Sequence, residues 1–443
     1  MIIFLLFKTF ESGKASAYFL RIRDKLPDFA CRSIKNIFFF YVHIINNFTR
    51  YISRSNYYSI MTKDEKLFRD VENFCKELRP VEDLCYLEHK HNDKLIPLAR
   101  KFNILGMPVK NHGRNTGNIA YTKSLARIAM EGTGIRTFFS GHSSLGQKTV
   151  QRFANENQKK KYLLPSVKGK IIFAFALTEP EAGSNPLSLK MTYKEKNGEY
   201  VLNGVKYLIS NAGIANAIIT FARGPNKKIS AFLVETNRKG IMREDMAAKM
   251  GMPTTNTAMF ELKNYKIPKE NLLGKKDHGW EIAKYALMNG RLSVAAGCVG
   301  VIEDCLIEAA RFSKERIQHG KLIAKHQLIQ EHIAIIKTYL ESSRLIVERA
   351  AKLMDSFESS KEEKARQAAD SAIAEAKLFC ANAAWESADR AVQILGGRGW
   401  SFLYRPGRHL VDTRICRIYE GTDEILKLKI ASAFLGKNFE AYS

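Results

Sequence analysis

The sequence predicts a mainly helical α+β protein in which a small β domain lies between two helical regions. Apolar residues recur every three or four positions before residue 165 and again after Gly274. Between these regions, short apolar or alternating runs accompany Asn-Gly pairs, as in antiparallel sheets. The 443 residues, 45% apolar and 26% charged, suffice for two or three domains with a substantial core. A disulfide-stapled miniprotein and a disordered chain are excluded.

Residues 1–60 differ in composition from the rest, with nine Lys and Arg against three acids and many Ile, Phe, Asn and Tyr. Their longest strongly apolar stretch, residues 37–45, falls far below the roughly 20 residues that span a bilayer, so we predict no integral membrane segment. The basic, acid-poor composition is compatible with a mitochondrial presequence. Met61, however, opens a sequence that looks like an ordinary start, which favours a non-functional extension or a misplaced start. We predict a cytoplasmic protein, with the mitochondrial matrix as the alternative if 1–60 is a presequence.

Residues 61–168 are predicted to form an N-terminal helical domain. Leu67, Val71, Phe74 and Leu78 recur at the spacing of one helix face. No long run of β-branched residues interrupts this pattern before Pro165. The helices should therefore bury one face each against a common core.

Residues 169–274 are predicted to form the middle, antiparallel β domain. Asn197-Gly198 and Asn203-Gly204 are pairs that adopt positive φ in the turns of hairpins. The predicted strands are 171–177, 200–210, 217–222, 229–234 and 258–267.

Residues 275–443 are predicted to form a C-terminal helical bundle, with the polar stretch 356–364 connecting two long helices. One helix face is apolar, and the other carries small residues that permit close approach. The first face comprises Ile329, Ile333, Ile336, Leu340, Val347, Ala350 and Met354, and the second comprises Ala372, Ala376, Phe379 and Ala383.

The formal net charge of +25 indicates anionic partners or substrates, and residues 61–443 alone retain +19. Charge does not distinguish nucleotides, lipids, acidic proteins and nucleic acid. The seven Cys are scattered, without a C-x-x-C pair or a nearby His at ligand spacing. We therefore predict no metal site and a reducing compartment.

Two predicted strands end in loops of small and hydroxylic residues. In residues 175–185, Phe-Ala-Leu-Thr-Glu-Pro-Glu-Ala-Gly-Ser-Asn, the hydroxyls of Thr178 and Ser184 and backbone N–H groups could meet a ligand. Residues 208–213, Leu-Ile-Ser-Asn-Ala-Gly, end another strand in the same style. The same residue types are ordinary turn formers. Two such exits in one sheet favour a shared ligand.

Two further segments carry possible chemistry near the C-terminus. The glycine-rich break 393–399 could present amides to a diphosphate, although it lacks the dinucleotide fingerprint and is also compatible with a helix C-cap. Glu420, within 417–422, stands in an apolar and basic neighbourhood. A bound apolar substrate would desolvate this carboxylate and raise its pKa toward that of a useful base. A salt-bridged surface Glu is the alternative.

Together and in order, these segments resemble the acyl-CoA dehydrogenase family of flavoproteins over residues 62–435. Each segment is weak alone, but the ordered set is specific. The set comprises Gln158-Lys-Lys-Lys-Tyr-Leu-Leu-Pro165, Thr178-Glu-Pro-Glu-Ala-Gly-Ser184, Leu202-Asn-Gly-Val-Lys206, Lys249-Met-Gly-Met-Pro253, Ile267-Pro-Lys-Glu-Asn271, Gly290-Arg291, Glu315-Arg316, His326-Gln327, Gln393-Ile-Leu-Gly-Gly397 and Ile418-Tyr-Glu-Gly-Thr422. The resemblance implies the family's helical domain, β domain and C-terminal four-helix bundle.

The resemblance also implies noncovalent FAD shared between subunits of a homo-oligomer, a homotetramer arranged as a dimer of dimers. Residues expected to line the flavin are Phe175, Ala176, Leu177, Thr178, Gly183, Ser184, Ile209 and Ser210, with Ser210 near N5. Those expected to hold the diphosphate and adenosine of a neighbouring subunit's FAD are Arg316, Gln327, Gln393, Leu395, Gly396 and Gly397, and Thr422 belongs to the cofactor-binding set.

The implied substrate is an acyl-CoA thioester of fatty acid β-oxidation. By this resemblance Ser184 and Arg291 contact coenzyme A, Tyr419 and Gly421 join the substrate site, and Glu420 removes the α-proton. The β-hydrogen leaves as hydride to flavin N5, which gives a trans-2-enoyl-CoA, and electrons pass to an electron-transfer flavoprotein. Some members carry the base immediately before the arginine. That position is Gly290 here, which leaves Glu420 as the candidate.

Several positions depart from the family's pattern. Leu208 stands where many members have a flavin-flanking Trp, His319 where Phe is usual, Asn185 where Asp is common and Met288 where several members have an acid. Assignment of the substrate by nearest relative is therefore unsafe, and the acyl length and branching stay open.

Three alternative functions remain. One is acyl-CoA oxidase activity, since the access of oxygen to a reduced flavin cannot be read from a sequence. Another is a DNA-associated flavoprotein of the alkylation-response branch, but the basic residues are mixed with acids and Lys159–Lys161 is the only tight triplet, so we expect no nucleic-acid partner. The third is peripheral membrane attachment, as in the very-long-chain branch, whose long C-terminal extension has no counterpart here.

Overall fold

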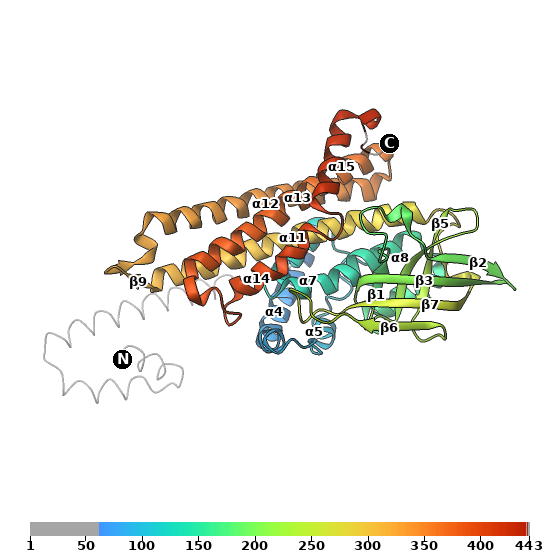
Figure 1. The fold of residues 1–443 in the computed structure, drawn as a ribbon, viewed down its shortest axis with the longest axis horizontal. Helices are drawn as coiled ribbons and strands as arrows, with labels where there is room; N and C mark the ends of the chain where they lie inside the picture. Colours follow the sequence, from blue (N-terminus) through green and yellow to red (C-terminus); the bar gives the residue numbers. More distant parts are fainter. Residues whose placement is uncertain (1–61, 440, 442–443) are drawn as a thin grey trace. The chain divides into compact units, whose positions relative to one another are not determined.

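The computed structural model describes residues 62–439 and Ala441. Residues Lys63–Ser443 form one unit, in which other helices and the sheet pack against the long helix α11 (Gly279–Glu315) (Figure 1). The extension predicted at residues 1–60 lies outside the described residues.

The N-terminal part is helical, as the apolar spacing predicts. Leu67, Val71, Phe74 and Leu78 are buried on one face of its first helix. The elements are α4 (Lys63–Leu87), α5 (Leu95–Lys101), α6 (Asn118–Ala129), α7 (Thr133–Phe139), the π-helix η1 (Ser140–Gln147), α8 (Lys148–Phe153), α9 (Glu156–Gln158), the π-helix η2 (Lys159–Leu163) and α10 (Leu164–Val167). Every residue of α7 and η1 is buried: α7 packs against α6, α11 and α14 (Arg405–Thr413), and η1 packs against α11 and the first strand of the sheet, β1 (Phe173–Ala176).

The middle part forms an eight-stranded sheet. Its strands are β1 (Phe173–Ala176), β2 (Thr192–Lys196), β3 (Glu199–Ser210), β4 (Ala217–Arg223), β5 (Ile229–Glu235), β6 (Ile241–Asp245), β7 (Thr257–Pro268) and β8 (Leu272–Leu273). Their order is β6-β7-β3-β2-β4-β5-β8, with β1 paired to β4. Most pairs are antiparallel, but β1 and β2 meet β4 in parallel, so the sheet is mixed rather than wholly antiparallel. The β2–β3 hairpin separates β1 from β4 in the chain, and this long connection allows β4 to run parallel to β1.

The two predicted Asn-Gly turns have different outcomes. Asn197-Gly198 joins β2 to β3 with both residues at positive φ, as predicted. Asn203-Gly204 is not a turn but lies inside β3, where the register with β7 shifts. A Cβ at Gly204 would lie 2.7 Å from Met191 Cα, so glycine is required by the close strand approach. The short strands β2, β6 and β8 were not predicted, because β2 and β6 are mostly exposed and lack buried alternation.

The C-terminal part is a bundle of long helices. Its elements are α11 (Gly279–Glu315), the short strands β9 (Ile317–Gln318) and β10 (Lys321–Leu322), α12 (Gln327–Ser360), α13 (Glu363–Leu395), α14 (Arg405–Thr413) and α15 (Asp423–Leu435). The connection predicted at 356–364 is shorter, since α12 continues to Ser360 and ends at Lys361 in the left-handed conformation. The predicted apolar face is buried at Ile336, Leu340 and Val347, whereas Phe379 is 36% exposed and lies off the α13 face.

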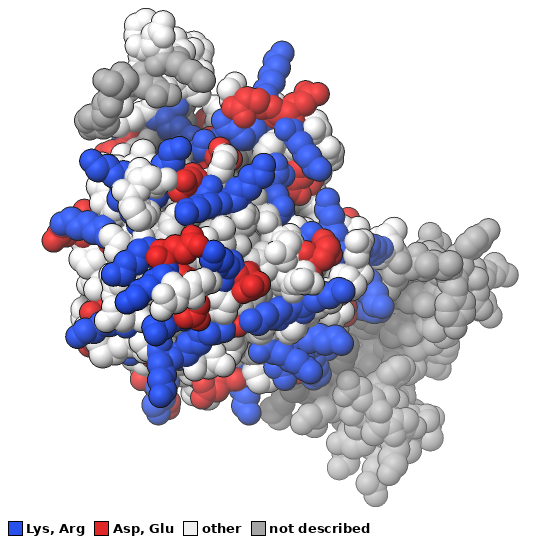
Figure 2. Space-filling model, turned by 90° about the vertical axis from the view of Figure 1, so that its right-hand side faces the viewer, with Lys and Arg blue, Asp and Glu red and all other residues white. Residues whose placement is uncertain are grey.

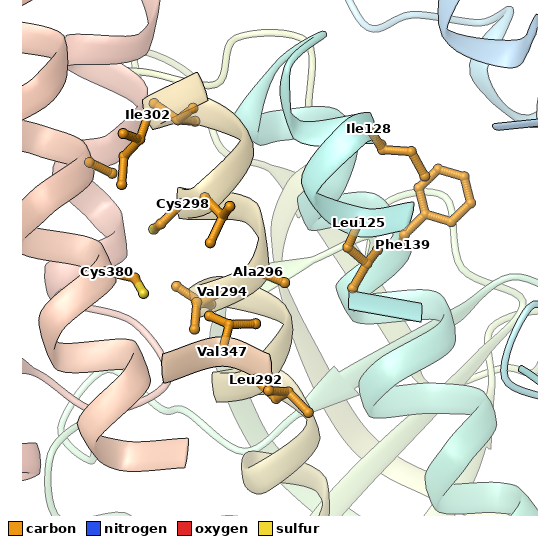
Figure 3. Packing of buried hydrophobic residues seen from close by; sticks show 14 of the residues in the cluster. Leu125, Ile128, Phe139, Leu292, Val294, Ala296, Cys298, Ile302, Val347 and Cys380 are labelled. Carbon is orange, nitrogen blue, oxygen red and sulfur yellow. The ribbon is translucent and has the colours of Figure 1, made fainter. Parts of the chain in front are cut away.

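Helix α11 is the central element of the core. Every residue from 288 to 302 is buried, as expected of a helix covered on all sides. Figure 3 shows its Leu292, Val294 and Ile302 between α6 and α7 on one side and α12 and α13 on the other. No helix among the described residues is long and apolar enough to cross a membrane.

Candidate active site

A cavity of about 540 Å³ lies where the ends of β1 and β3 meet α7, η1, α11 and the segment before α15. It collects most of the residues predicted for flavin and substrate. The predicted residues that line it are Phe175, Leu177, Thr178, Gly183, Ser184, Ile209, Ser210, Arg291, Tyr419, Glu420 and Gly421. Ala176 and Thr422 do not line it. Ala176 packs in the core, and the Thr422 hydroxyl accepts the Ile425 N–H as the N-cap of α15.

The two predicted strand exits lie side by side at this cavity. The Tyr207 N–H donates to the Thr178 carbonyl at 3.0 Å, which joins the end of β3 to the loop after β1. The loop is shaped by Glu179, whose carboxylate accepts from the Met191 N–H at 3.0 Å and from Lys206 Nζ at 2.8 Å. Glu179 and Lys206 are both buried, and burial lowers the pKa of Lys206 to about 8. Sequence reasoning did not assign this ion pair.

Leu208 lies at a strained point of β3 on the cavity wall. Its φ is +60°, a left-handed value that is rare for leucine, and it coincides with the register shift between Lys206 and Ile209. The side chain is 49% exposed and lines the cavity. A bulge of this kind re-aims a side chain, and here it presents an apolar group to the cavity beside Ser210.

Glu420 also has a strained backbone, with φ at +58°, followed by Gly421 at +95°. Such a conformation costs on the order of 1–3 kcal/mol for a residue with a side chain. Two cations hold it: Arg291 Nε donates to the Glu420 carbonyl at 2.8 Å, and Lys377 Nζ donates to the Gly421 carbonyl at 2.7 Å. Arg291 also pairs with Asp370 at 3.5 Å. The predicted coenzyme A contact Arg291 is thus placed where it fixes the Glu420 turn.

The carboxyl group of Glu420 is placed against the backbone of α11. A Cβ at Gly290 would lie 2.5 Å from its carboxyl carbon, so only glycine leaves room there. Part of the side chain reaches the cavity, while Oε2 is buried without a hydrogen-bond partner among residues 62–439. Burial raises the pKa of Glu420 to about 7 against the opposing charges of Arg291, Arg136 and Lys377. This pKa suits a group that accepts a proton near neutral pH.

Arg136 and Ser140 also line the cavity, and sequence reasoning missed both. Arg136 Nη2 donates to the Tyr419 hydroxyl next to Glu420. Arg136 is the one charged residue in the segment 133–139, which could have drawn attention to it. The helical period alone, however, assigns a charged residue to a solvated face. In the fold α7 has no solvated face.

A second cavity of about 530 Å³ lies at the other end of α11. Arg316, Leu395, Gly396 and Gly397 line it, whereas the exposed Gln327 and Gln393 do not. Among residues 62–439, and apart from the adjoining residues of the chain, no heavy atom lies within 4 Å of a Cβ built at Gly396 or Gly397, so this backbone is open to an approaching group. Arg291 and Arg316 are 25 residues apart, which corresponds to about 38 Å along a helix. Figure 1 shows the two ends of α11, near the sheet and near β9. The two cavities therefore lie toward opposite ends of α11.

No group of three His, Cys, Asp or Glu in the described part of the chain could hold a metal ion. The six cysteines of residues 62–439 are free thiols, and five of them are buried.

Comparisons with known proteins agree with this arrangement. The chain matches the family models described as acyl-CoA dehydrogenase N-terminal domain at 62–170, middle domain at 174–265 and C-terminal domain at 277–435. It is 35% identical to an acyl-CoA dehydrogenase of Bacillus subtilis over 84% of this chain and 97% of that protein.

Two solved structures have similar folds. An acyl-CoA dehydrogenase of Bacillus anthracis complexed with FAD superposes with a TM-score of 0.81 and 29% identity, over 85% of this chain and 67% of that chain. A chain in a structure of the electron transferring flavoprotein of Acidaminococcus fermentans superposes with a TM-score of 0.80 and 30% identity, over 85% of this chain and 99% of that one.

Proposed function

This chain belongs to the acyl-CoA dehydrogenase family, and from that premise we propose that it removes the α-proton of an acyl-CoA thioester with Glu420 and forms a trans-2-enoyl-CoA. It is an oxidoreductase that acts on a CH–CH bond with a flavin acceptor. The observation that carries the role of Glu420 is its carboxyl group in the cavity, which is unpartnered at Oε2 and has a pKa of about 7.

The cofactor is FAD, and the residues around the main cavity fit it. The hydroxyls of Thr178, Ser184 and Ser210 stand at the strand exits. In the described part of the chain, apart from the adjoining residues, no heavy atom lies within 4 Å of a Cβ built at Gly183. Hydroxyls and an open backbone are groups that can hydrogen-bond the carbonyls and nitrogens of a flavin ring. When bound, FAD accepts the hydride that leaves the substrate's β-carbon.

Two groups of Glu420, its backbone N–H and its carboxyl group, are assigned to proton removal. An α-proton of a thioester is weakly acidic, so the carbonyl oxygen needs a preorganised donor as negative charge develops. We assign that donation to the Glu420 backbone N–H, whose position is fixed by the bonds from Arg291 and Lys377 to the adjoining carbonyls. The same turn points the carboxyl group of Glu420 at Gly290 and into the cavity. Donor and base are therefore held by a single strained turn.

The function is tested by anaerobic bleaching of bound FAD with short, medium, long and branched acyl-CoA thioesters. We expect at least one of them to bleach the flavin and to yield the 2-enoyl product. If no acyl-CoA bleaches FAD that is stoichiometrically bound, the proposed function is wrong.

We propose that the second cavity holds the diphosphate and adenosine of a neighbouring subunit's FAD, so the site needs a homo-oligomer, a dimer of dimers. The proposal is supported by the separation of about 38 Å along α11 and by Arg316 beside the open backbone of Gly396 and Gly397, a combination that suits phosphate. Sedimentation of the FAD-loaded protein tests it, and a monomer that retains FAD would contradict it.

We propose an electron-transfer flavoprotein as the acceptor, which is supported by the similarity to the Acidaminococcus fermentans chain. Release of hydrogen peroxide at the rate of turnover would identify an oxidase instead. For nucleic acid we expect no binding, since Figure 2 shows Lys and Arg spread over the visible face with Asp and Glu among them and no continuous stripe. A cytoplasmic location stays a prediction, because it depends on residues 1–60.

A further inference from the structure

The carboxylate of Asp370 is shared by three cations. Asp370 lies on α13, and its side chain is 14% exposed. Oδ1 pairs with Arg291 Nη1 of α11 at 3.5 Å, whereas Oδ2 pairs with Lys429 Nζ of α15 at 2.6 Å and with Arg366 Nη1 of α13 at 3.7 Å. A single side chain of α13 therefore connects α11 with α15.

Two of these cations belong to the wall of the main cavity, and Asp370 lies behind them. Arg291 and Lys429 line the cavity, whereas Asp370 does not. Helix α15, which carries Lys429, begins three residues after Glu420. Asp370 can therefore influence the cavity through its partners but not by direct contact with a ligand.

Arg291 is held at two points of one guanidinium group. Its Nε donates to the Glu420 carbonyl at 2.8 Å, and its Nη1 donates to Asp370 Oδ1 at 3.5 Å. The guanidinium group is planar, so a carboxylate at Nη1 fixes the plane in which Nε donates. Within the range 62–439, Asp370 is the carboxylate that lies within 4.0 Å of this group. Arg291 is buried, so the pair is screened less than a surface pair.

Lys429 holds the same carboxylate from the other side. Its Nζ lies 2.6 Å from Oδ2, which leaves Oδ1 for Arg291. The Lys429 side chain is 32% exposed, and ion pairs of exposed side chains contribute little stability. The main effect of Lys429 is therefore to orient Asp370.

The other cation on this turn also has a carboxylate beside it. Lys377 Nζ donates to the Gly421 carbonyl at 2.7 Å and lies 3.9 Å from Asp423 Oδ1. Asp423 is the first residue of α15 and also accepts from Arg417 Nε at 2.9 Å, so it is part of the turn itself. Asp370 comes from another helix, so its replacement leaves the residues of the turn unchanged.

We propose, on the basis of the proposed function, that Asp370 is a positioning residue for proton removal, which holds the Arg291 guanidinium group against the Glu420 carbonyl. A fixed carbonyl maintains the left-handed conformation of Glu420, and with it the directions of the backbone N–H and the carboxyl group. Asp370 thus acts from outside the cavity, and Lys429 and Arg366 hold it in place.

Asp370 also reduces the positive charge near Glu420. Burial raises the pKa of Glu420 to about 7, and the groups that lower it are Arg291 of α11, Arg136 of α7 and Lys377 of α13. Among these three, Arg291 has the largest effect. The negative charge of Asp370 lies next to Arg291, so its loss leaves that cation uncompensated and should lower the pKa of Glu420.

Asp370→Asn removes the charge while it keeps the size of the side chain. With the acyl-CoA that bleaches the flavin fastest, we expect the saturating rate of flavin reduction to fall about 10- to 100-fold, as for a group misplaced by about 1 Å. The half-saturating concentration should change by less than about 3-fold. The pH below which the rate declines should move below that of the wild type. Asp370→Glu keeps the charge on a longer arm, so it should restore the pH profile and part of the rate.

A measurement without turnover tests the effect of the charge separately. Because the pKa of Glu420 is raised in the folded state, the wild type loses stability relative to Glu420→Gln as pH rises from 4.5 toward 7. In the Asp370→Asn background this relative loss should be smaller and should end at a lower pH. Glu375→Gln is the matched control, because Glu375 is a carboxylate of α13 that pairs with Arg349 at 2.8 Å outside the cavity. It should change neither the rate nor this pH.

The failures of the two proposals are distinguishable. If no acyl-CoA bleaches FAD bound to the wild type, the proposed function is wrong, and the melting comparison still tests Asp370. If Asp370→Asn lowers the melting temperature but leaves the rate and the pH profile unchanged, Asp370 only connects helices and the positioning proposal is overturned. A higher half-saturating concentration at an unchanged rate overturns it as well. If Asp370→Asn does not retain FAD, a wild-type rate in Asp370→Glu contradicts the proposal and a reduced rate with the wild-type pH profile supports it.

Discussion

Substitution of Glu420 by glutamine removes the proposed base while it keeps the size of the side chain. Glu420→Gln should retain FAD, because the strained turn is held through backbone carbonyls, which the substitution does not change. Flavin bleaching should slow by about 10²–10⁴-fold, the usual contribution of a positioned general base. Glu424→Gln is the matched control, an exposed glutamate on the next helix, and it should bleach normally.

The same substitution should change how stability depends on pH. Burial raises the pKa of Glu420 from 4.5 to about 7, so the folded state binds this proton more tightly than the unfolded state. The wild type therefore loses stability as pH rises from 4.5 through 7, by at most about 3 kcal/mol at 1.36 kcal/mol per pKa unit. Glutamine does not titrate, and the variant avoids this loss.

The magnitude can be measured by melting of the FAD-loaded proteins. Between pH 5.5 and 8 the variant should gain roughly 2 kcal/mol relative to the wild type. At about 2.1 cal/mol/K per residue of unfolding entropy, this is a relative rise in Tm of about 2 to 3 °C. The wild-type kcat/KM should rise with pH and level off above about 7, because the ionised carboxylate is the active form. A pH-independent difference in Tm, or bleaching of Glu420→Gln at the wild-type rate, would refute the assignment.

Three further substitutions test other parts of the site. Gly290→Ala places a Cβ 2.5 Å from the carboxyl carbon of Glu420 and should displace the carboxyl group. We expect kcat to fall about 100-fold with FAD retained, and an unchanged rate of flavin bleaching would contradict the geometry. Lys206→Met should destabilise the protein by about 3–5 kcal/mol, because it leaves Glu179 buried and unpaired. In a thermal melt, the double variant with Glu179→Gln should recover part of the lost stability. Arg316→Ala should weaken FAD retention on dilution about 10- to 100-fold without altering the bleaching of fully loaded enzyme, and equal retention would remove Arg316 from the cofactor site.

The sequence predicted the parts of the site that lie on strand exits and turns. Thr178, Ser210 and Glu420 stand in local segments whose residue types restrict the backbone conformation. The structure places all three at one cavity. Asn203-Gly204 shows the limit of this reasoning, because the same pair serves a turn or a bulge according to the strand that packs beside it. Strand β6 was not predicted for a similar reason: most of its residues are exposed, and its pairing with β7 makes it a strand.

The buried position of Arg136 at the cavity could not be predicted from the sequence, for a different reason. A periodicity argument treats a charged residue in a helix as a marker of the solvated face, and it fails where both sides of a helix are covered. The compensating feature is Gly297, which leaves room for the Arg136 side chain. It lies more than 150 residues away in the chain, and nothing in the local sequence connects the two. Buried charges of this kind become visible only when the packing partners are known.

The site retains two features that cost stability, an unpaired guanidinium at Arg136 and a left-handed backbone at Glu420. Such costs persist where they serve function, and their removal should stabilise the protein at the expense of activity. Arg136→Met, close in volume to the aliphatic part of arginine, should therefore melt at the same temperature as the wild type or higher. If Arg136 were structural, its loss would leave the buried Tyr419 hydroxyl without this donor and lower the melting temperature. A melting temperature well below that of the wild type would thus show that Arg136 stabilises the fold.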